Sequence, residues 1–326
     1  MFIEIGSPAS LPLGLVRLEG ESGPQTCLLG VTLQHPPVNL SVQAHPGGLQ
    51  VSGARADLGY AQAARFLNHH HLPRRAEVEI ELAIPSLVGL GSEAMLGLSL
   101  AQALAWLNHL PLDDTLALAQ AVGLQPQDAL EVWGYDRGGL LLVEVGQTEN
   151  FLPPIRRYEI AHSEQEAWAF VLILPRVSAN TPETLEADRL KALLAAAPYL
   201  SADTGRIVTA EVEPALANND LAAFGRSLMA LQALNDEGLT RAGVPLSYTS
   251  EEQAVLDIIC EHGAAAWGRS ATGLALYGLV KGARSSIDLR HKLRHHLGFF
   301  GGRAMAAITA NTGASYVIKD YDLKAK

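Results

Sequence analysis

The stretch Ile84-Pro85-Ser86-Leu87-Val88-Gly89-Leu90-Gly91-Ser92-Glu93-Ala94-Met95 decides the fold of this chain. Before it, Glu77-Val78-Glu79-Ile80-Glu81-Leu82-Ala83-Ile84 alternates apolar and polar residues, which is typical of a half-buried strand. After it, the apolar segment Glu93–Asn108 predicts a helix. The order is therefore a strand, a glycine turn and a helix. At such a junction the first helical amides lack intrahelical acceptors, and the helix dipole adds partial positive charge.

This junction predicts a phosphate-binding loop. Glycines let the backbone approach an anion closely, and the hydroxyl of Ser92 suits a phosphate or a magnesium ion. The predicted phosphate-binding residues are Gly89, Leu90, Gly91, Ser92, Glu93 and Ala94. The Glu93 carboxylate repels a bound pyrophosphate unless magnesium bridges the two, so Ser92 and Glu93 are the predicted Mg²⁺ ligands. A plain glycine turn with Ser92 as the N-cap is the alternative.

Composition limits the possible partners. The chain has 326 residues, of which 48% are hydrophobic and 18% charged, and its formal net charge is -10. The length suggests two domains. The acidity disfavours nucleic acid and anionic membranes as partners. Cys27 and Cys260 are far apart and suggest reduced thiols, the longest apolar run is Leu96–Leu107, and the start lacks signal-peptide features. We therefore expect a cytoplasmic protein.

The distribution of apolar residues predicts an α+β fold. Short strands are expected at Leu13–Leu18, Leu28–Leu33, Val38–Gln43, Leu140–Val145, Trp168–Leu174, Gly273–Val280 and Ala304–Thr309. Helices are expected around Tyr60–Leu67, at Asp113–Val122, Pro182–Ala196, Asp203–Ala217, Leu221–Leu234 and Ser285–Leu297, and from a capping box at Ser250–Gln253 to Gly263. Prolines and polar residues in Gly146–Glu159 suggest a boundary, with domains 1–155 and 156–326.

Three motifs resemble the GHMP kinase superfamily. They are the Pro-x-x-x-Gly-Leu-Gly-Ser pattern of the loop, the glycine-rich segment Gly263–Gly273 before the strand Leu274–Val280, and Asp136–Gly139 before an apolar strand. The resemblance implies a two-domain fold with an N-terminal mixed β-sheet domain, which carries the phosphate loop, and a ferredoxin-like α+β C-terminal domain. It also implies that Gly268, Arg269 and Ser270 bind phosphate.

Within that superfamily the chain is similar to the β-ribofuranosylaminobenzene 5'-phosphate synthases over nearly its whole length. The matching segments are Ser7-Pro8, Leu18–Gly20, Gly30–Leu33, Val88–Ser92, Arg137–Gly139, Gly263–Ala265, Ala275–Gly278 and Ala310–Ala314. The resemblance implies a magnesium-dependent transferase of methanopterin synthesis, a pterin-cofactor pathway. The family joins phosphoribosyl pyrophosphate to 4-aminobenzoate and releases pyrophosphate and carbon dioxide.

Departures from the synthase pattern keep two further functions open. Ala9–Pro12 stands where the synthases have a Ser-Arg-Leu-His-like stretch, Glu93–Met95 replaces Gly-Thr-Gln, and Trp267–Ser270 replaces a serine-rich turn. These losses favour a divergent paralogue that binds a ligand without catalysis.

Glu131 favours an ATP-dependent small-molecule kinase instead. It falls where GHMP kinases place their catalytic aspartate, and a carboxylate there can act as a general base, with Ser92 on magnesium. The alternative is that Glu131 and Asp128 solvate a short helix. Against a kinase, the first lysine of the chain is Lys191, whereas these kinases use one near the N-terminus.

Other charged residues carry weaker predictions. Arg17, Arg137 or Arg269 would supply positive charge to the phosphates. His69–His71 and the pair His291 and His295 are interpreted as solvated helix residues rather than metal ligands. The expected partner is a small phosphate ligand, either phosphoribosyl pyrophosphate or ATP, and a homodimer is expected.

Overall fold

The computed structural model describes residues 1–20, 23–111, 114–145, 150–160, 167–244 and 247–319. It is an α+β structure built on two sheets, as the sequence predicts. The larger sheet is mixed: β3 runs parallel to β4 and the other pairs are antiparallel. Its strands are β1 (Phe2–Gly20), β2 (Gly23–Ala44), β3 (Gln50–Gly53), β4 (Ala76–Leu82), β5 (Leu140–Glu144), β6 (Arg156–Tyr158) and β11 (Ser315–Lys319).

The strands β1 and β2 form a long hairpin in place of the three short strands expected. The stretch Leu13–Leu18 lies within β1, and both Leu28–Leu33 and Val38–Gln43 lie within β2. Pro8, Pro12 and Gly14 lie inside β1 rather than in turns. They coincide with register shifts between Ser7 and Ala9 and between Pro12 and Gly14, which a long strand tolerates as irregularities.

Four helices accompany the larger sheet: α1 (Ala56–His69), α2 (Ser92–Leu107), α3 (Thr115–Ala121) and α4 (Ala129–Arg137). Helix α2 is almost entirely buried against β1 and β2, which explains its continuous apolar sequence. Its burial fixes the position of the glycine loop that precedes it.

The smaller sheet is antiparallel, in the order β10-β7-β9-β8. Its strands are β7 (Trp168–Leu174), β8 (Ala266–Arg269), β9 (Leu276–Lys281) and β10 (Arg303–Ile308). The helices of this half are α5 (Leu185–Ala196), α6 (Asp203–Ile207), α7 (Glu213–Ala217), α8 (Leu221–Arg241), α9 (Ser250–Glu261) and α10 (Gly282–Phe300), with a π-helical turn at Val208–Val212. The capping box of α9 pairs Thr249 with Glu252, one residue earlier than expected.

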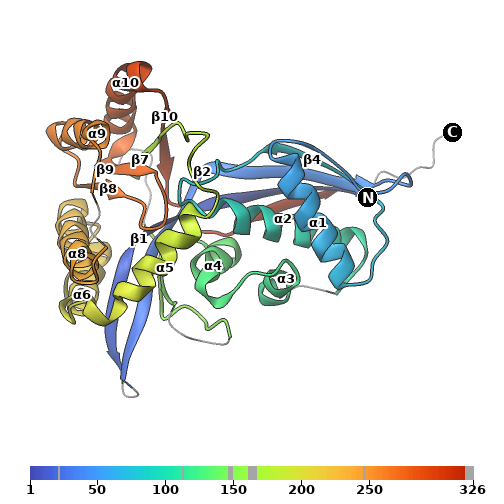
Figure 1. Ribbon diagram of the computed structural model, residues 1–326, viewed down its shortest axis with the longest axis horizontal. Coiled ribbons are helices and arrows are strands. Elements are labelled where there is room, and N and C mark those ends of the chain that lie inside the picture. The colour runs from blue at the N-terminus through green and yellow to red at the C-terminus, as the bar shows by residue number, and fades with distance from the viewer. Residues whose placement is uncertain (21–22, 112–113, 146–149, 161–166, 245–246, 320–326) are drawn as a thin grey trace.

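The two sheets meet near the middle of the molecule (Figure 1). Thr309, after β10, forms a bridge with Leu33 of β2, and β11 pairs with β1 of the larger sheet. Helix α5 lies between α8 and α4, where the two groups of helices approach each other (Figure 1). The expected domain boundary falls just before β6 and stays a prediction. None of the described helices is both long and apolar enough to cross a bilayer.

Candidate functional site

The predicted phosphate loop connects β4 to α2 through a backbone that turns sharply three times. Leu87, Gly89 and Gly91 have positive φ values of 64°, 72° and 73°. Such values suit glycine and are strained at Leu87. Val88 and Leu90 are fully buried and anchor the loop in the core. The backbone of this turn therefore requires the glycines at positions 89 and 91.

Residues of the C-terminal half donate hydrogen bonds to the carbonyl groups of the loop. The amides of Leu274 and Ala275 donate to the carbonyls of Leu87 and Val88 over 3.1 and 2.9 Å. The buried hydroxyl of Ser270 donates to the carbonyl of Gly89 over 2.7 Å. With these carbonyls engaged, the loop's shape depends on both halves of the chain.

Helix α2 begins at Ser92, and Gly91 is its N-cap, so Ser92 is not the cap residue considered above. Glycine offers no side-chain acceptor to the first-turn amides of the helix. The Ser92 hydroxyl is buried and has no hydrogen-bond partner. A buried polar group without a partner is costly, which is typical of a group that meets a ligand.

Ser92 lines a cavity of about 180 Å³ in front of the loop. Much of the predicted site lines this cavity: Gly89, Gly91, Ser92, Glu93, Ala94 and Glu131. Leu28, Gln127, Asp128, Glu186, Ala187, Leu190 and Thr272 complete its lining. The cavity thus receives side chains from α2, α4 and α5.

Four carboxylates, those of Glu93, Asp128, Glu131 and Glu186, line this cavity. Burial, followed by repulsion from Asp128, raises the pKa of Glu131 to about 8. Burial also raises the pKa of Asp128, although a hydrogen bond from the Gln125 amide opposes this. The cavity therefore favours cations, or anions that arrive with a cation.

The Glu186 side chain accepts a hydrogen bond from a backbone amide of the predicted phosphate loop. Its Oε1 accepts the Gly89 N–H at 2.5 Å, although the two residues are 97 positions apart. Burial raises the pKa of Glu186, the Gly89 hydrogen bond lowers it, and the nearby Glu93 raises it further. Three residues along α5, Arg189 donates to the carbonyl of Gly273.

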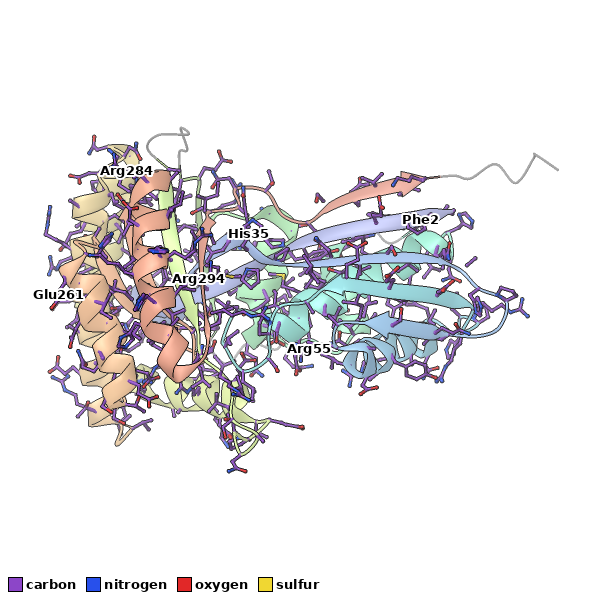
Figure 2. The ribbon with its side chains drawn as sticks, turned by 90° about the horizontal axis from the view of Figure 1, so that it is seen from above. Phe2, His35, Arg55, Glu261, Arg284 and Arg294 are labelled. Atoms are coloured by element: carbon purple, nitrogen blue, oxygen red, sulfur yellow. The ribbon has the colours of Figure 1, made fainter. Side chains whose placement is uncertain are left out.

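Arg55 forms an ion pair with one of these four carboxylates, that of Glu93. Its Nη2 lies 3.6 Å from Glu93 Oε1, and its Nη1 is buried without a hydrogen-bond partner. Burial lowers its pKa, whereas Glu93 and Glu186 raise it. Figure 2 shows Arg55 near the middle of the molecule, away from Arg284 and Arg294 on α10. No sequence motif surrounds Arg55, so sequence reasoning missed it; Glu186 was missed for the same reason.

The other predicted phosphate-binding residues have different surroundings. Arg269 is buried against Tyr248, Glu252 and the carbonyl of Ser247, not in the cavity. Gly268 packs against Gln232.

Two further cations are paired elsewhere. Arg17 bonds to Glu19 at 2.9 Å, and Arg137 bonds to Asp136 at 3.0 Å. Among the described residues, no three His, Cys, Asp or Glu side chains are arranged to hold a metal on their own. A metal at Ser92 would accordingly need ligand oxygens as well.

Solved structures share this architecture along almost the entire chain. The mevalonate kinase of L. major superposes with a TM-score of 0.67 at 14% identity, covering 94% of this chain and 96% of that one. The mevalonate diphosphate decarboxylase of Staphylococcus aureus has a TM-score of 0.66 at 16% identity, covering 97% and 98%. The protein has the GHMP-kinase fold.

A curated protein is also similar in sequence. The beta-ribofuranosylphenol 5'-phosphate synthase of Methanothermobacter thermautotrophicus is 24% identical over 304 residues, which cover 85% of this chain and 88% of that protein. No protein-family model matches the chain. The chain is thus similar in sequence to a synthase, whereas the mevalonate kinase is similar in fold.

Proposed function

We propose that the protein is a transferase like the β-ribofuranosylaminobenzene 5'-phosphate synthases. It would join phosphoribosyl pyrophosphate to an aminobenzoate-type acceptor, in the synthesis of a pterin cofactor such as methanopterin. The observation that carries the proposal is the buried, unpartnered hydroxyl of Ser92, a residue of the cavity lining at the start of α2, where no side chain caps the helix. The similarity to a curated synthase over most of the chain supports this choice among the functions of the fold.

In the proposed reaction, the bond between the anomeric carbon and the pyrophosphate oxygen breaks, and its electron pair leaves with pyrophosphate. The ring carbon that carries the acceptor's carboxylate bonds to the anomeric carbon. Carbon dioxide then leaves, and the electrons of its bond restore the aromatic ring. The relative's name specifies a phenol product, so hydroxybenzoates belong with aminobenzoates in the acceptor class to be tested.

The chain's own groups would bind the leaving pyrophosphate. The first-turn amides of α2 and the Ser92 hydroxyl donate hydrogen bonds to its oxygens. Arg55 adds positive charge at the edge of the cavity. Because its pKa is raised to about 8, Glu131 is mostly protonated at neutral pH and can donate a hydrogen bond instead of repelling the phosphate.

Magnesium fits this site as a proposed cofactor. The unpartnered Ser92 oxygen and the Glu93 carboxylate lie in the lining of the same cavity. One or two protein oxygens, completed by water and phosphate oxygens, are a usual magnesium environment. When bound, the ion would neutralise charge that develops on the pyrophosphate.

An ATP-dependent kinase is the second candidate, and Glu131 is the observation that favours it. The carboxylate lines the same cavity as Ser92, where a general base would meet a substrate hydroxyl. At a pKa of about 8, however, only a minor fraction of Glu131 is ionised at neutral pH. A non-catalytic binding protein is the third candidate, and the contact between Glu186 and Gly89 favours it.

One assay separates the three. The protein is incubated with magnesium, phosphoribosyl pyrophosphate and 4-aminobenzoate or 4-hydroxybenzoate, and pyrophosphate and carbon dioxide are measured. We expect equal amounts of both, and Ser92→Ala lowers kcat/KM by about 10- to 100-fold. Ser86→Ala, in the same loop but outside the cavity lining, is the control. ADP formation from ATP with an alcohol would replace the proposal by the kinase, and inactivity with both donors would leave a binding protein.

Two further expectations belong to the proposal. Cys27 and Cys260 are both free thiols, which supports a reducing, cytoplasmic location. A homodimer is also expected, and size-exclusion chromatography with light scattering tests it.

A further inference from the structure

Helix α5 binds both glycine segments of the site from one side. Glu186 accepts the Gly89 amide at 2.5 Å, and Arg189, three residues later on the same helical face, donates to the Gly273 carbonyl. Ala187 and Leu190 of the same helix form part of the cavity lining. A carboxylate on a glycine-loop amide takes the position that a phosphate oxygen takes in a loop of this kind.

The position of Glu186 is electrostatically poor apart from that single hydrogen bond. The Glu93 carboxylate lines the same cavity, and like charges this close repel each other. Arg55 forms an ion pair with Glu93 at 3.6 Å, and its attraction is the smallest of the influences on Glu186, so it offsets the repulsion only in part. A phosphate that brings its own cation would replace Glu186 at this amide with much of its negative charge already neutralised.

The attachment of α5 allows its beginning to move separately from its end. The buried residues of α5 are Leu193 and Ala196, in its last turn. Its N-cap residue, Thr184, bonds within the helix, to the Asp188 carboxylate at 2.8 Å, and its side chain caps no backbone amide. A helix end with few buried contacts opens at a lower free-energy cost than the core. The first turn, which carries Glu186, can therefore lift while the last turn stays packed.

We propose that α5 is a latch over the phosphate loop, with Glu186 as an internal substitute for the ligand's phosphate that must leave before the ligand binds. This inference rests on the loop being a phosphate site, as in the proposed function. The latch makes Glu186 a specificity-determining residue, because only an anion with its own cation displaces it effectively.

Isothermal titration with inorganic pyrophosphate and magnesium tests the latch in three variants. Glu186→Ala removes the competing carboxylate, and we expect binding about tenfold tighter than in the unmodified protein. Glu186→Gln keeps the acceptor but not the charge, and we expect an intermediate affinity. Glu183→Ala removes an exposed carboxylate three residues earlier and should leave affinity unchanged. Unchanged, weaker or absent binding in Glu186→Ala overturns the latch.

Hydrogen–deuterium exchange of the unmodified protein gives a second, independent readout. Magnesium pyrophosphate should protect residues 86–95 and increase exchange in residues 185–190, because Glu186 is expelled. Protection of both segments together would mean that α5 stays in place, and it would overturn the latch.

The latch and the proposed function can fail separately. Tight binding in Glu186→Ala without ribosyl transfer to any acceptor would remove the function and leave the latch. Transfer by the unmodified protein, with no gain of affinity in Glu186→Ala, would remove the latch and leave the function.

Discussion

Gly89 and Gly273 face each other where the two halves of the chain meet, and neither position has room for a side chain. A Cβ at Gly89 would run into the backbone of Gly273, and a Cβ at Gly273 into the backbone of Gly89. Backbone atoms cannot move aside as a flexible side chain can. The phosphate loop and the C-terminal glycine segment therefore form one unit, although 184 positions separate the two glycines.

This close approach predicts a graded response to alanine at three glycines. Gly243→Ala places a side chain at a φ of 78° with none of the described atoms within 4 Å of its Cβ, so it should lower the free energy of unfolding by about 1 kcal/mol. Gly273→Ala introduces the clash alone and should cost about 1–3 kcal/mol. Gly89→Ala, with φ of 72° and the clash, should cost more than either. Urea unfolding measures all three.

The same variants separate folding from ligand binding. At temperatures where each variant remains folded, Gly273→Ala should weaken magnesium pyrophosphate binding, whereas Gly243→Ala should not. Equal effects of the two on binding would show that the glycine contact is not needed for the loop's shape.

A second prediction concerns pH and Glu131. Its pKa is about 8 in the folded protein and 4.5 ordinarily, so the folded state binds the proton more tightly. This contribution to stability is fully present below about pH 4.5 and is lost as pH rises through about 8. Glu131→Gln should remove it, which makes the free energy of unfolding less dependent on pH by about 3–4 kcal/mol between pH 5 and 8.

Urea unfolding at pH 5, 6.5 and 8 checks this prediction. Glu81→Gln, at an exposed position of β4, is the control and should follow the unmodified protein. A parallel pH dependence in Glu131→Gln and the unmodified protein would contradict the prediction. Kinetics give a related test, because a kinase with Glu131 as its base should gain activity as pH rises towards 8.

The sequence predicted the parts of the site that depend on local backbone geometry. The turn at Gly89 and Gly91 needs positive φ, and α2 needs a continuous apolar segment, so both leave a pattern in consecutive residues. The resemblance to the GHMP kinases also led to Glu131, which lines the cavity, although its catalytic role stays a prediction. Glu186 and Arg55 left no pattern, because their contacts arise only when distant segments pack together.

The fold was predicted in outline for the same reason. Alternating or apolar runs indicated many of the strands and the α+β class, whereas the arrangement in two sheets was implied by the resemblance to the GHMP kinases. The long β1–β2 hairpin was missed because its prolines and glycines are typical of turns in sequence, whereas pairing along both strands keeps them extended. The strand β11 was missed because all five of its residues are exposed, so no buried face marks it.

A third prediction concerns Asn235 of α8, which connects the C-terminal half to β1. Its buried side chain accepts the Leu15 amide at 2.7 Å and donates to the Leu15 carbonyl at 2.9 Å. Asn235→Ala leaves two buried backbone groups unpaired and should cost about 2–4 kcal/mol in urea unfolding. Asn218→Ala removes an exposed asparagine bonded only to a carbonyl of its own helix, and it should cost less than about 1 kcal/mol. Equal costs would contradict this role.

The last prediction asks whether Arg269 serves structure or phosphate binding. Its guanidinium is 6% exposed, lies 3.3 Å from Glu252 and stacks 4.7 Å from the centre of the Tyr248 ring. Arg269→Gln leaves the Glu252 carboxylate buried without its partner, so we expect a loss of about 3–5 kcal/mol. The double variant Arg269→Gln/Glu252→Gln should recover part of that loss, because no unpaired charge remains.

The exposed pair of Arg241 and Glu237 on α8 supplies the matched control, since Arg241→Gln should cost no more than about 0.5 kcal/mol. The double variant at Arg269 and Glu252 then tests binding in a folded protein. If the Arg269 guanidinium is structural, the affinity of the double variant for magnesium pyrophosphate stays within about twofold of that of the unmodified protein, because the loop amides and Ser92 are unchanged. A tenfold loss in a double variant of normal stability would instead return Arg269 to the phosphate site that the glycine-rich segment suggested.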